Sequence, residues 1–210
     1  GLAGVIRISA PVTFGEAYLG RMFARFALQN PGLSFDIRLS DGFVDLASDG
    51  IDLAFRIGQS DMLSLKTRKL GEIRSVAVAS PDYVALHGAP EDPAELAQHH
   101  CILDTNRRTS RRWVFFEHGQ EIVAEVKGRF QVNSARAAVE LAADGLGICY
   151  APHFALRDEL ETGALVQVLQ DFEGLGVEIN AVYLEGRALP RKIRALIDFA
   201  VEDIRRSGTL

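Results

Sequence analysis

Two stretches of the sequence, one in each half, pass from a strand pattern through a short polar junction into a helix pattern. The first is VIRISAPVTFGEAYL at residues 5–19, and the second lies within FQVNSARAAVELAADGLGICYAP at residues 130–152. The first amides of a helix have no partner inside the helix, and the helix dipole gives them partial positive charge. In open α/β sheets such helix starts gather beyond the carboxyl ends of the strands, where ligands bind. The repeated pattern therefore predicts an α/β protein that binds a ligand at bare amides of these junctions.

The spacing of apolar residues predicts alternating strands and helices over residues 1–80. Residues 19–27 carry apolar side chains at helical spacing, whereas residues 33–39 and 51–57 alternate apolar and polar residues as strands do. A short helix is expected around residues 44–48, and further strands from residue 67 to residue 80. This β-α-β-α-β order is typical of a mainly parallel sheet covered by helices.

The composition changes at residues 80–100, which are rich in proline, glycine and short helical pieces. Such a change is typical of a chain that leaves one lobe and starts another. Residues 113–126 are expected to form a hairpin that turns at His118 and Gly119, and a helix is expected at residues 153–161. A helical apolar stripe from Pro190 to Ile204 predicts a long final helix.

The formal net charge of −5 argues against nucleic-acid binding by this chain alone, because nucleic acids require a basic face. The nearest basic cluster is interpreted as a solvated loop; it consists of Arg107, Arg108, Arg111 and Arg112. No apolar run is long enough to span a bilayer and no signal peptide opens the chain, so no membrane partner is expected.

The sequence contains no recognisable catalytic, metal or cofactor motif. HHC at residues 99–101 has no second ligand pair at zinc spacing, and no GxSxG, HExxH, GxxxxGK[ST] or GxGxxG string occurs. No nucleophile or acid–base group can be assembled, so no enzyme activity, no metal and no cofactor are expected. Cys101 and Cys149 lie far apart among apolar neighbours, which favours buried reduced thiols in a cytoplasmic protein; one disulfide is the alternative.

Polar residues at the two junctions could add side-chain hydrogen bonds to a bound anion: Ser9, Thr13, Asn133 and Ser134. The alternative is that Thr13, Asn133 and Ser134 only cap helices, which is the commonest role of such residues. Arg56 closes a strand in the string FRIG, where a guanidinium can clasp a carboxylate with two parallel hydrogen bonds. The alternative for Arg56 is a surface ion pair.

Residues 4–58, which include RISAP at 7–11 and FRIG at 55–58, resemble the start of the effector-binding (substrate-binding) domain of LysR-type transcriptional regulators. Residues 130–169 resemble the second lobe of that domain. RISAP and SPDYVA, the latter at 80–85, resemble the subgroup of the family that has Ser-Ala-Pro after the first strand. The likeness runs from Gly4 to about Arg205. It depends on many moderately specific positions in order, and not on one sharp motif.

The resemblance implies an α/β, two-lobed type 2 periplasmic-binding-protein-like fold. Each lobe would be a mainly parallel sheet flanked by helices, with two crossover strands between them. On that basis residues 1–80 and 185–210 form lobe I, and residues 81–184 form lobe II. The winged helix-turn-helix that reads DNA in this family lies N-terminal to this region and is absent from this chain, so operator DNA would be bound only through that missing domain.

The resemblance also implies a small organic effector in the inter-lobe cleft. The positions that match the family's binding loops are Ser9, Ala10, Pro11, Thr13, Phe14, Gly42, Phe43, Arg56, Ile57, Gly58, Asp104, Asn133 and Pro152. The helix starts favour a carboxylate, whereas Phe14, Phe43 and Ile57 would equally line a pocket for an aromatic ring.

The resemblance implies a homodimer of such domains, and a tetramer when the protein is full-length. Residues 18–28 and 135–143 are the expected dimer face, although a face rich in alanine also suits packing within one chain. The expected function is control of transcription by an effector that alters dimer or tetramer geometry. The expected location is the cytoplasm. The alternative is a solute-binding receptor of a transport system with the same fold.

Overall fold

The computed structural model describes residues 1–42, 44–58, 65–185 and 188–207. Contacts divide the chain into two units, which we describe separately. Unit 1 comprises Gly1–Ile73 and Val177–Leu210, and unit 2 comprises Arg74–Gly176. Phe43 lies outside the described residues. The lobe boundaries expected from the sequence, after residue 80 and before residue 185, stay predictions.

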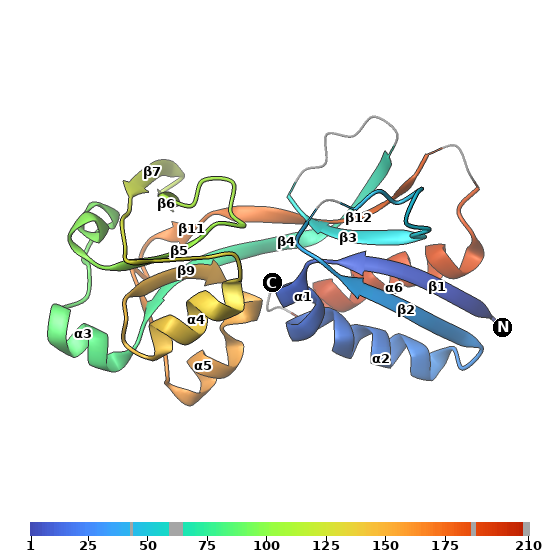
Figure 1. Cartoon of the computed structure of the whole chain (residues 1–210), viewed down its shortest axis with the longest axis horizontal. Coiled ribbons are helices and arrows are strands. Elements are labelled where there is room, and N and C mark those ends of the chain that lie inside the picture. Colours follow the sequence, from blue (N-terminus) through green and yellow to red (C-terminus); the bar gives the residue numbers. More distant parts are fainter. Residues whose placement is uncertain (43, 59–64, 186–187, 208–210) are drawn as a thin grey trace. The chain divides into compact units, whose positions relative to one another are not determined.

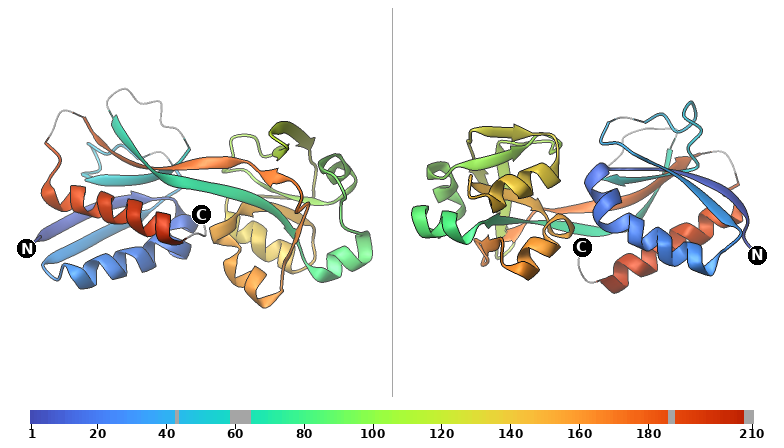
Figure 2. Two further views of the ribbon diagram at one scale, coloured as in Figure 1. Left: turned by 180° about the vertical axis from the view of Figure 1, so that it is seen from behind. Right: turned by 60° about the horizontal axis from the view of Figure 1, so that its bottom comes forward.

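Unit 1 is built on a sheet with the strand order β2-β1-β3-β12. The strands β1 (Gly4–Ala10), β2 (Leu33–Leu39) and β3 (Leu53–Ile57) are parallel to one another, whereas β12 (Gly176–Leu184) is antiparallel to β3. The helical segments are α1 (Val12–Phe14), η1 (Gly15–Leu19), α2 (Gly20–Gln29) and α6 (Arg191–Ser207). The helices α2 and α6 lie side by side on one face of this sheet (Figure 1, Figure 2).

Aromatic side chains join these helices to the sheet of unit 1. The ring of Phe23 on α2 lies 5.7 Å from that of Phe55 on β3, and Phe26 lies 5.1 Å from Phe199 on α6. Such pairs bury large apolar areas and add about 0.5–1.5 kcal/mol each beyond that burial. The apolar stripe that predicted a helix at residues 19–27 is therefore the stripe that faces the sheet.

The sheet of unit 2 has the strand order β4-β9-β5-β8, to which β4 contributes its residues from Arg74 onward. The strands β5 (Cys101–Asp104), β8 (Phe130–Val132) and β9 (Ile148–Pro152) are parallel, and β4 (Leu65–Ala79) pairs antiparallel with β9 and with β10 (Val166–Val168). A small sheet joins β6 (Arg112–Glu117), β7 (Gln120–Glu125) and β11 (Glu173–Gly174). The helical segments are α3 (Pro81–His87), η2 (Pro93–Gln98), α4 (Ala135–Ala143), η3 (His153–Ala155) and α5 (Arg157–Thr162).

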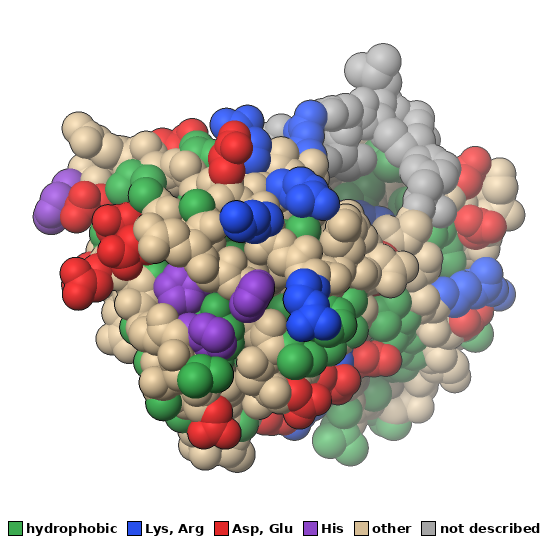
Figure 3. Space-filling view, turned by 60° about the vertical axis from the view of Figure 1, so that its left-hand side comes forward, with side chains coloured by type: hydrophobic (Ala, Val, Ile, Leu, Met, Phe, Trp, Pro, Cys, Tyr) green, Lys and Arg blue, Asp and Glu red, His purple; other side chains and the backbone are tan. Residues whose placement is uncertain are grey.

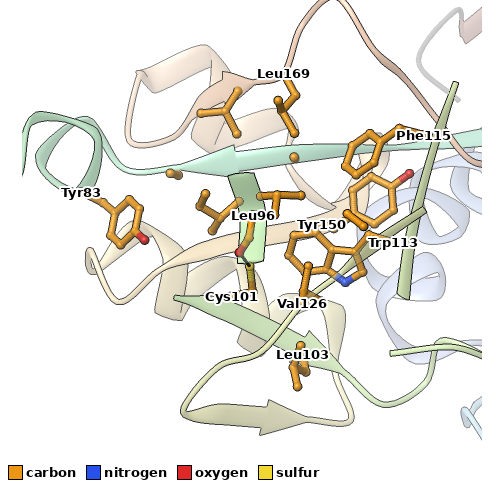
Figure 4. Packing of buried hydrophobic residues seen from close by; sticks show 14 residues of the cluster. Tyr83, Leu96, Cys101, Leu103, Trp113, Phe115, Val126, Tyr150 and Leu169 are labelled. Atoms are coloured by element: carbon orange, nitrogen blue, oxygen red, sulfur yellow. Dashed lines mark hydrogen bonds between the residues drawn. The ribbon is translucent and has the colours of Figure 1, made fainter. Parts of the chain in front are cut away.

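The core of unit 2 is centred on an aromatic cluster from β6 and β9. The ring of Trp113 stacks on that of Tyr150 at 5.3 Å, and Phe115 packs on Tyr150 at 4.9 Å (Figure 4). Leu96 and Leu103 are buried in the same cluster. Trp113 and Phe115, two aromatic residues of the hairpin, therefore belong to the core of unit 2.

Most of the expected elements are present, and the expected α/β class with crossover strands is confirmed. The hairpin turns at His118 and Gly119, both of which have positive φ (49° and 79°), as a two-residue type I′ turn requires. The expected strands at residues 67–80 form the single strand β4. The expected helix at residues 153–161 divides into η3 and α5. None of the described helices has the length and apolar character of a bilayer span.

The short helix expected around residues 44–48 is wrong. The Asp45 carboxylate accepts hydrogen bonds from the backbone amides of Ala47 (3.0 Å) and Ser48 (3.2 Å), and the chain forms a turn at residues 46–50. An aspartate that binds nearby amides in this way competes with helix formation.

The expectation of reduced, buried thiols is confirmed, because Cys101 and Cys149 are both free and buried.

Candidate functional site

The carboxyl ends of β1, β2 and β3 lie at one edge of the sheet of unit 1, because these strands are parallel. The amide of Ser40, which follows β2, donates to the carbonyl of Ala10 at the end of β1 (2.9 Å) and holds the two ends together. We call the polar groups at this edge site 1; they are Ser9, Asp41, Arg56, Gly58 and Asn180. Carboxyl edges of parallel strands are where ligands bind in α/β sheets.

Arg56 is the cationic group of site 1. Its Nη2 donates to Oγ of the fully buried Ser9 (3.0 Å), and its Nη1 donates to the carbonyl of Phe55 (2.9 Å). Burial lowers the pKa of the guanidinium, and the negative charge of Asp41 opposes that shift. No ion pair of Arg56 is recorded within the described ranges, so the sequence-based alternative of a surface ion pair finds no support there. Arg56 is therefore a positioned, partly buried cation.

Asn180 was not identified from the sequence, although a polar residue within the apolar run VEINAVYL was a usable signal. It pairs with Arg56 across β3 and β12, is 2% exposed, and donates from Nδ2 to the carbonyl of Gly58 (3.1 Å). Gly58 has a φ of +90°, and its amide donates to the carbonyl of Glu178 (2.8 Å). These bonds fix the backbone of the FRIG turn beside Arg56.

The junction after β1 differs from the expectation of bare helical amides. The amide of Val12 donates to Oδ1 of Asp41 (3.0 Å), so one amide of this helix start is already paired inside unit 1. Pro11 occupies the N-cap position, and Thr13 lies within the helix, so the side chain of Thr13 does not cap it. Phe14 is buried and stacks on Tyr18 with ring centroids 5.5 Å apart.

The remaining predicted residues of unit 1 are placed around this junction. Ala10 is buried, Ile57 is partly buried at the end of β3, and Gly42 is exposed with its amide bonded to Oγ of Ser40 (3.1 Å). Their role in ligand binding stays a prediction.

In unit 2 the parallel strands β5, β8 and β9 end at a second polar edge, where Asp104, Asn133 and Pro152 stand. Oδ1 of Asp104 accepts from the amide of Asn106 (2.9 Å), and Nδ2 of Asn106 donates to the carbonyl of Asn133 (2.6 Å). Oγ of Ser134 accepts from the amide of Ala137 (3.2 Å), so the helix-capping interpretation is confirmed for Ser134. The side chain of Asn133 is exposed.

The interpretation of the arginine cluster as a solvated loop is wrong for Arg107 and agrees with the exposure of the other three arginines. Nη1 of Arg107 donates to Oγ of Ser75 (3.0 Å) and to the carbonyl of Tyr150 (3.2 Å). Its Cζ lies 4.5 Å from the centroid of the Tyr150 ring. Burial lowers the pKa of Arg107, and the charge of Asp104 is among the influences that oppose this shift. We call Ser75, Asp104, Arg107, Tyr150 and Pro152 site 2.

Histidine side chains gather on one face of unit 2 (Figure 3). The ring of His87 lies 4.5 Å from that of Tyr83, and Nδ1 of His99 lies 3.1 Å from the Tyr83 hydroxyl. Within the described residues, no group of three or more His, Cys, Asp or Glu side chains could hold a metal ion. His99 is thus hydrogen-bonded to Tyr83, and His87 packs against the Tyr83 ring.

The amino-acid sequence matches a family model described as "LysR substrate binding domain" over residues 1–205. A protein of Haemophilus influenzae named as an uncharacterized HTH-type transcriptional regulator is 32% identical over 195 residues, which cover 93% of this chain and 68% of the relative. The chain spans about two thirds of the length of the curated relatives that it matches.

Solved structures show the same fold. The regulatory domain of CrgA, a LysR-type transcriptional regulator from Neisseria meningitidis, matches with a TM-score of 0.85 at 26% identity, covering 96% of this chain and 99% of that one. The full-length Vibrio cholerae virulence activator AphB matches with a TM-score of 0.82 at 33% identity, covering 96% of this chain and 69% of that one. The two-lobed type 2 periplasmic-binding-protein-like fold is thereby confirmed.

Proposed function

This chain belongs to the family of LysR substrate-binding domains, and on that premise we propose that it is the part of a transcriptional regulator that senses a small organic effector. Its relatives are named as transcriptional regulators, which supports a regulatory role over a catalytic one. We therefore propose a binding domain without enzyme activity. Its setting is the cytoplasm, where a regulator meets DNA.

The single observation that carries the proposal is the position of Arg56 in site 1. The guanidinium is held by Ser9 and by the carbonyl of Phe55 at the carboxyl edge of a parallel sheet. A positioned guanidinium at such an edge suits the carboxylate of an organic molecule. We propose a carboxylate or an aromatic compound as the effector. Its binding in an inter-lobe cleft stays a prediction from the family resemblance.

The proposed partners follow from the family. The domain would form homodimers, and tetramers in the full-length protein, whose winged helix-turn-helix would bind operator DNA. The effector would act by binding one arrangement of the oligomer more tightly than another, because a ligand shifts an equilibrium only through differential affinity. Residues 18–28 and 135–143 stay the proposed dimer face.

The proposal is tested by thermal unfolding of the purified chain with a panel of organic acids and neutral aromatic compounds. A compound at about 100 times its dissociation constant should stabilise the folded protein by about 2.7 kcal/mol. Arg56→Gln should reduce the response to organic acids. Arg38→Gln is the matched control, because Arg38 is an exposed arginine on the neighbouring strand β2 that pairs with Asp36.

Two results would contradict the proposal. An unchanged response of Arg56→Gln to every stabilising compound would remove site 1 from effector binding. If the gene encoded a secretory signal upstream and no DNA-binding domain, the solute-binding receptor would replace the regulator as the better explanation. Steady turnover of a bound compound would favour an enzyme.

A further inference from the structure

Arg107 is held in place from one side. Its Nη1 donates both recorded hydrogen bonds, to Oγ of Ser75 and to the carbonyl of Tyr150, and its Cζ lies 4.5 Å from the centroid of the Tyr150 ring. Ser75 is itself buried, at 4% exposure, and the hydroxyl of Tyr150 is fixed by the carbonyl of Val114 (2.6 Å). The guanidinium therefore has a defined orientation before any ligand arrives.

The other donors of this guanidinium are unused within the described residues, since no bond from Nε or Nη2 of Arg107 is recorded. In the same part of the chain, the only buried side-chain nitrogen or oxygen without a hydrogen-bond partner is Oε2 of Glu159. The spare donors of Arg107 are consequently not fully buried. A guanidinium presents its Nε and Nη2 hydrogens in one plane, which matches the two oxygens of a carboxylate.

Arg107 forms no ion pair with an acidic side chain among the described residues. Asp104 is the carboxylate whose charge acts on Arg107, but Oδ1 of Asp104 accepts from the amide of Asn106. No ion pair between Asp104 and Arg107 is recorded in the described ranges. Pro152, a predicted site residue, pairs with Ser75 across β4 and β9, so the guanidinium is anchored at the edge where β9 ends.

We infer that Arg107 is a specificity-determining residue of unit 2, which binds the carboxylate of an organic-acid effector through Nε and Nη2. This inference depends on the proposed effector-sensing function and makes it narrower, because it selects organic acids over neutral compounds of the same shape. Hydrogen bonds to charged groups are the stronger ones in proteins. A neutral amide cannot replace a carboxylate here without leaving the cation unpaired.

The test compares matched acids and amides: phenylacetate with phenylacetamide, and butyrate with butyramide. Binding is followed by the fluorescence of Trp113, the single tryptophan of the sequence. Its ring stacks on Tyr150 (Figure 4), and Arg107 lies over the Tyr150 ring. Arg107→Gln should raise the dissociation constant of the bound acid about 10- to 100-fold and change that of the amide less than about twofold. Arg107→Lys should bind the acid with intermediate affinity.

Arg108→Gln is the matched control, because Arg108 is the exposed neighbour in the same loop. It should bind both members of each pair as the wild type does. Ser75→Ala keeps the charge of Arg107 but removes the hydroxyl that accepts from its Nη1. It should therefore reduce the affinity for the acid less than Arg107→Gln does. This variant keeps the inference testable if Arg107→Gln fails to fold.

The outcomes separate the inference from the function beneath it. Acids that bind wild type and Arg107→Gln equally would overturn the inference, as would a protein that binds only the amides; both results would leave effector sensing in place. Equal binding of the acid by Ser75→Ala and wild type, with Arg107→Gln unfolded, would also overturn it. If a wider panel of organic acids and neutral compounds gave no binding at all, the proposed function itself would fail.

Discussion

Asp41 accepts a hydrogen bond from the backbone amide of Val12 at 3.0 Å, and so closes the first helix start of unit 1 from a loop 29 residues further along the chain. Losing an acceptor for an N-terminal helix amide typically costs about 1 kcal/mol. We expect Asp41→Ala to lower the free energy of unfolding by about that amount. Asp41→Asn keeps an acceptor oxygen and should lose less. Urea unfolding measures both.

Asp49→Ala is the control for this prediction, since Asp49 is an exposed residue of the same loop region. It should unfold at the same urea concentration as the wild type. If Asp41→Ala also did so, the bond to Val12 would contribute nothing measurable.

Tyr18 should make the protein less stable in alkali. Its hydroxyl donates to Oδ2 of Asp203 (2.8 Å), and burial, with a further contribution from Asp203, raises its pKa from 10.0 to about 12. The unfolded chain therefore loses this proton first as the pH rises, and stability falls between pH 10 and pH 12 by about 1–2 kcal/mol. Tyr18→Phe should show a smaller fall in urea unfolding over that range. An identical fall in both proteins would contradict the prediction.

His99 should make the protein less stable in mild acid. Burial lowers its pKa below 6.5, and His87 and His100 act in the same direction, whereas Glu95 opposes them. The unfolded chain then binds the proton more readily than the folded one, so the contribution present above pH 6.5 is lost as the pH falls. Nδ1 of His99 lies 3.1 Å from the Tyr83 hydroxyl, which also accepts from the amide of His100 (3.0 Å), so His99 is held within this cluster in the folded protein.

The measurement for His99 is urea unfolding at about pH 7.5 and about pH 5.5. The wild type should lose stability between them, and His99→Gln should lose less. His118→Asn is the control, because His118 lies exposed in the hairpin turn with positive φ, which asparagine tolerates. A wild-type loss that persists unchanged in His99→Gln would assign the effect elsewhere.

Two glycines should respond to alanine in opposite directions. A Cβ at Gly174 would overlap the backbone carbonyl of Ser75, whereas a Cβ at Gly20 would meet nothing closer than 3.5 Å. Gly174→Ala should therefore destabilise by about 1–3 kcal/mol through overpacking. Gly20→Ala, in the exposed first turn of α2, should stabilise by up to about 1 kcal/mol. Thermal unfolding distinguishes the two signs, and a stable Gly174→Ala would show that β11 can move away from β4.

The alternation of elements could be predicted from the sequence because the periodicity that defines them is local. Ile6 and Ile8 alternate into the core, and the His118-Gly119 turn is set by two neighbouring residues. The helix expected at residues 44–48 failed because one side chain, that of Asp45, took the amides that a helix would need. A propensity argument does not contain that competition.

The candidate sites could be predicted only in outline. The edges were found because strands and helix starts can be read from the sequence, and Arg56 was found because it ends a strand. The orientation of Arg107 depends on Ser75 and Tyr150, which lie 32 and 43 residues away in the chain. The sequence contains four arginines close together, and nothing in it indicates which of them bonds to distant residues of unit 2.

The strand β4 runs without interruption from Leu65 to Ala79, and the boundary between the two units falls inside it, after Ile73. A chain cut at that boundary would carry the first part of β4 on one fragment and the second part on the other. Backbone groups that pair with the missing part of the strand would then lose their hydrogen-bond partners. Neither half is therefore a self-sufficient fragment, and a single proteolytic nick in β4 would compromise both at once.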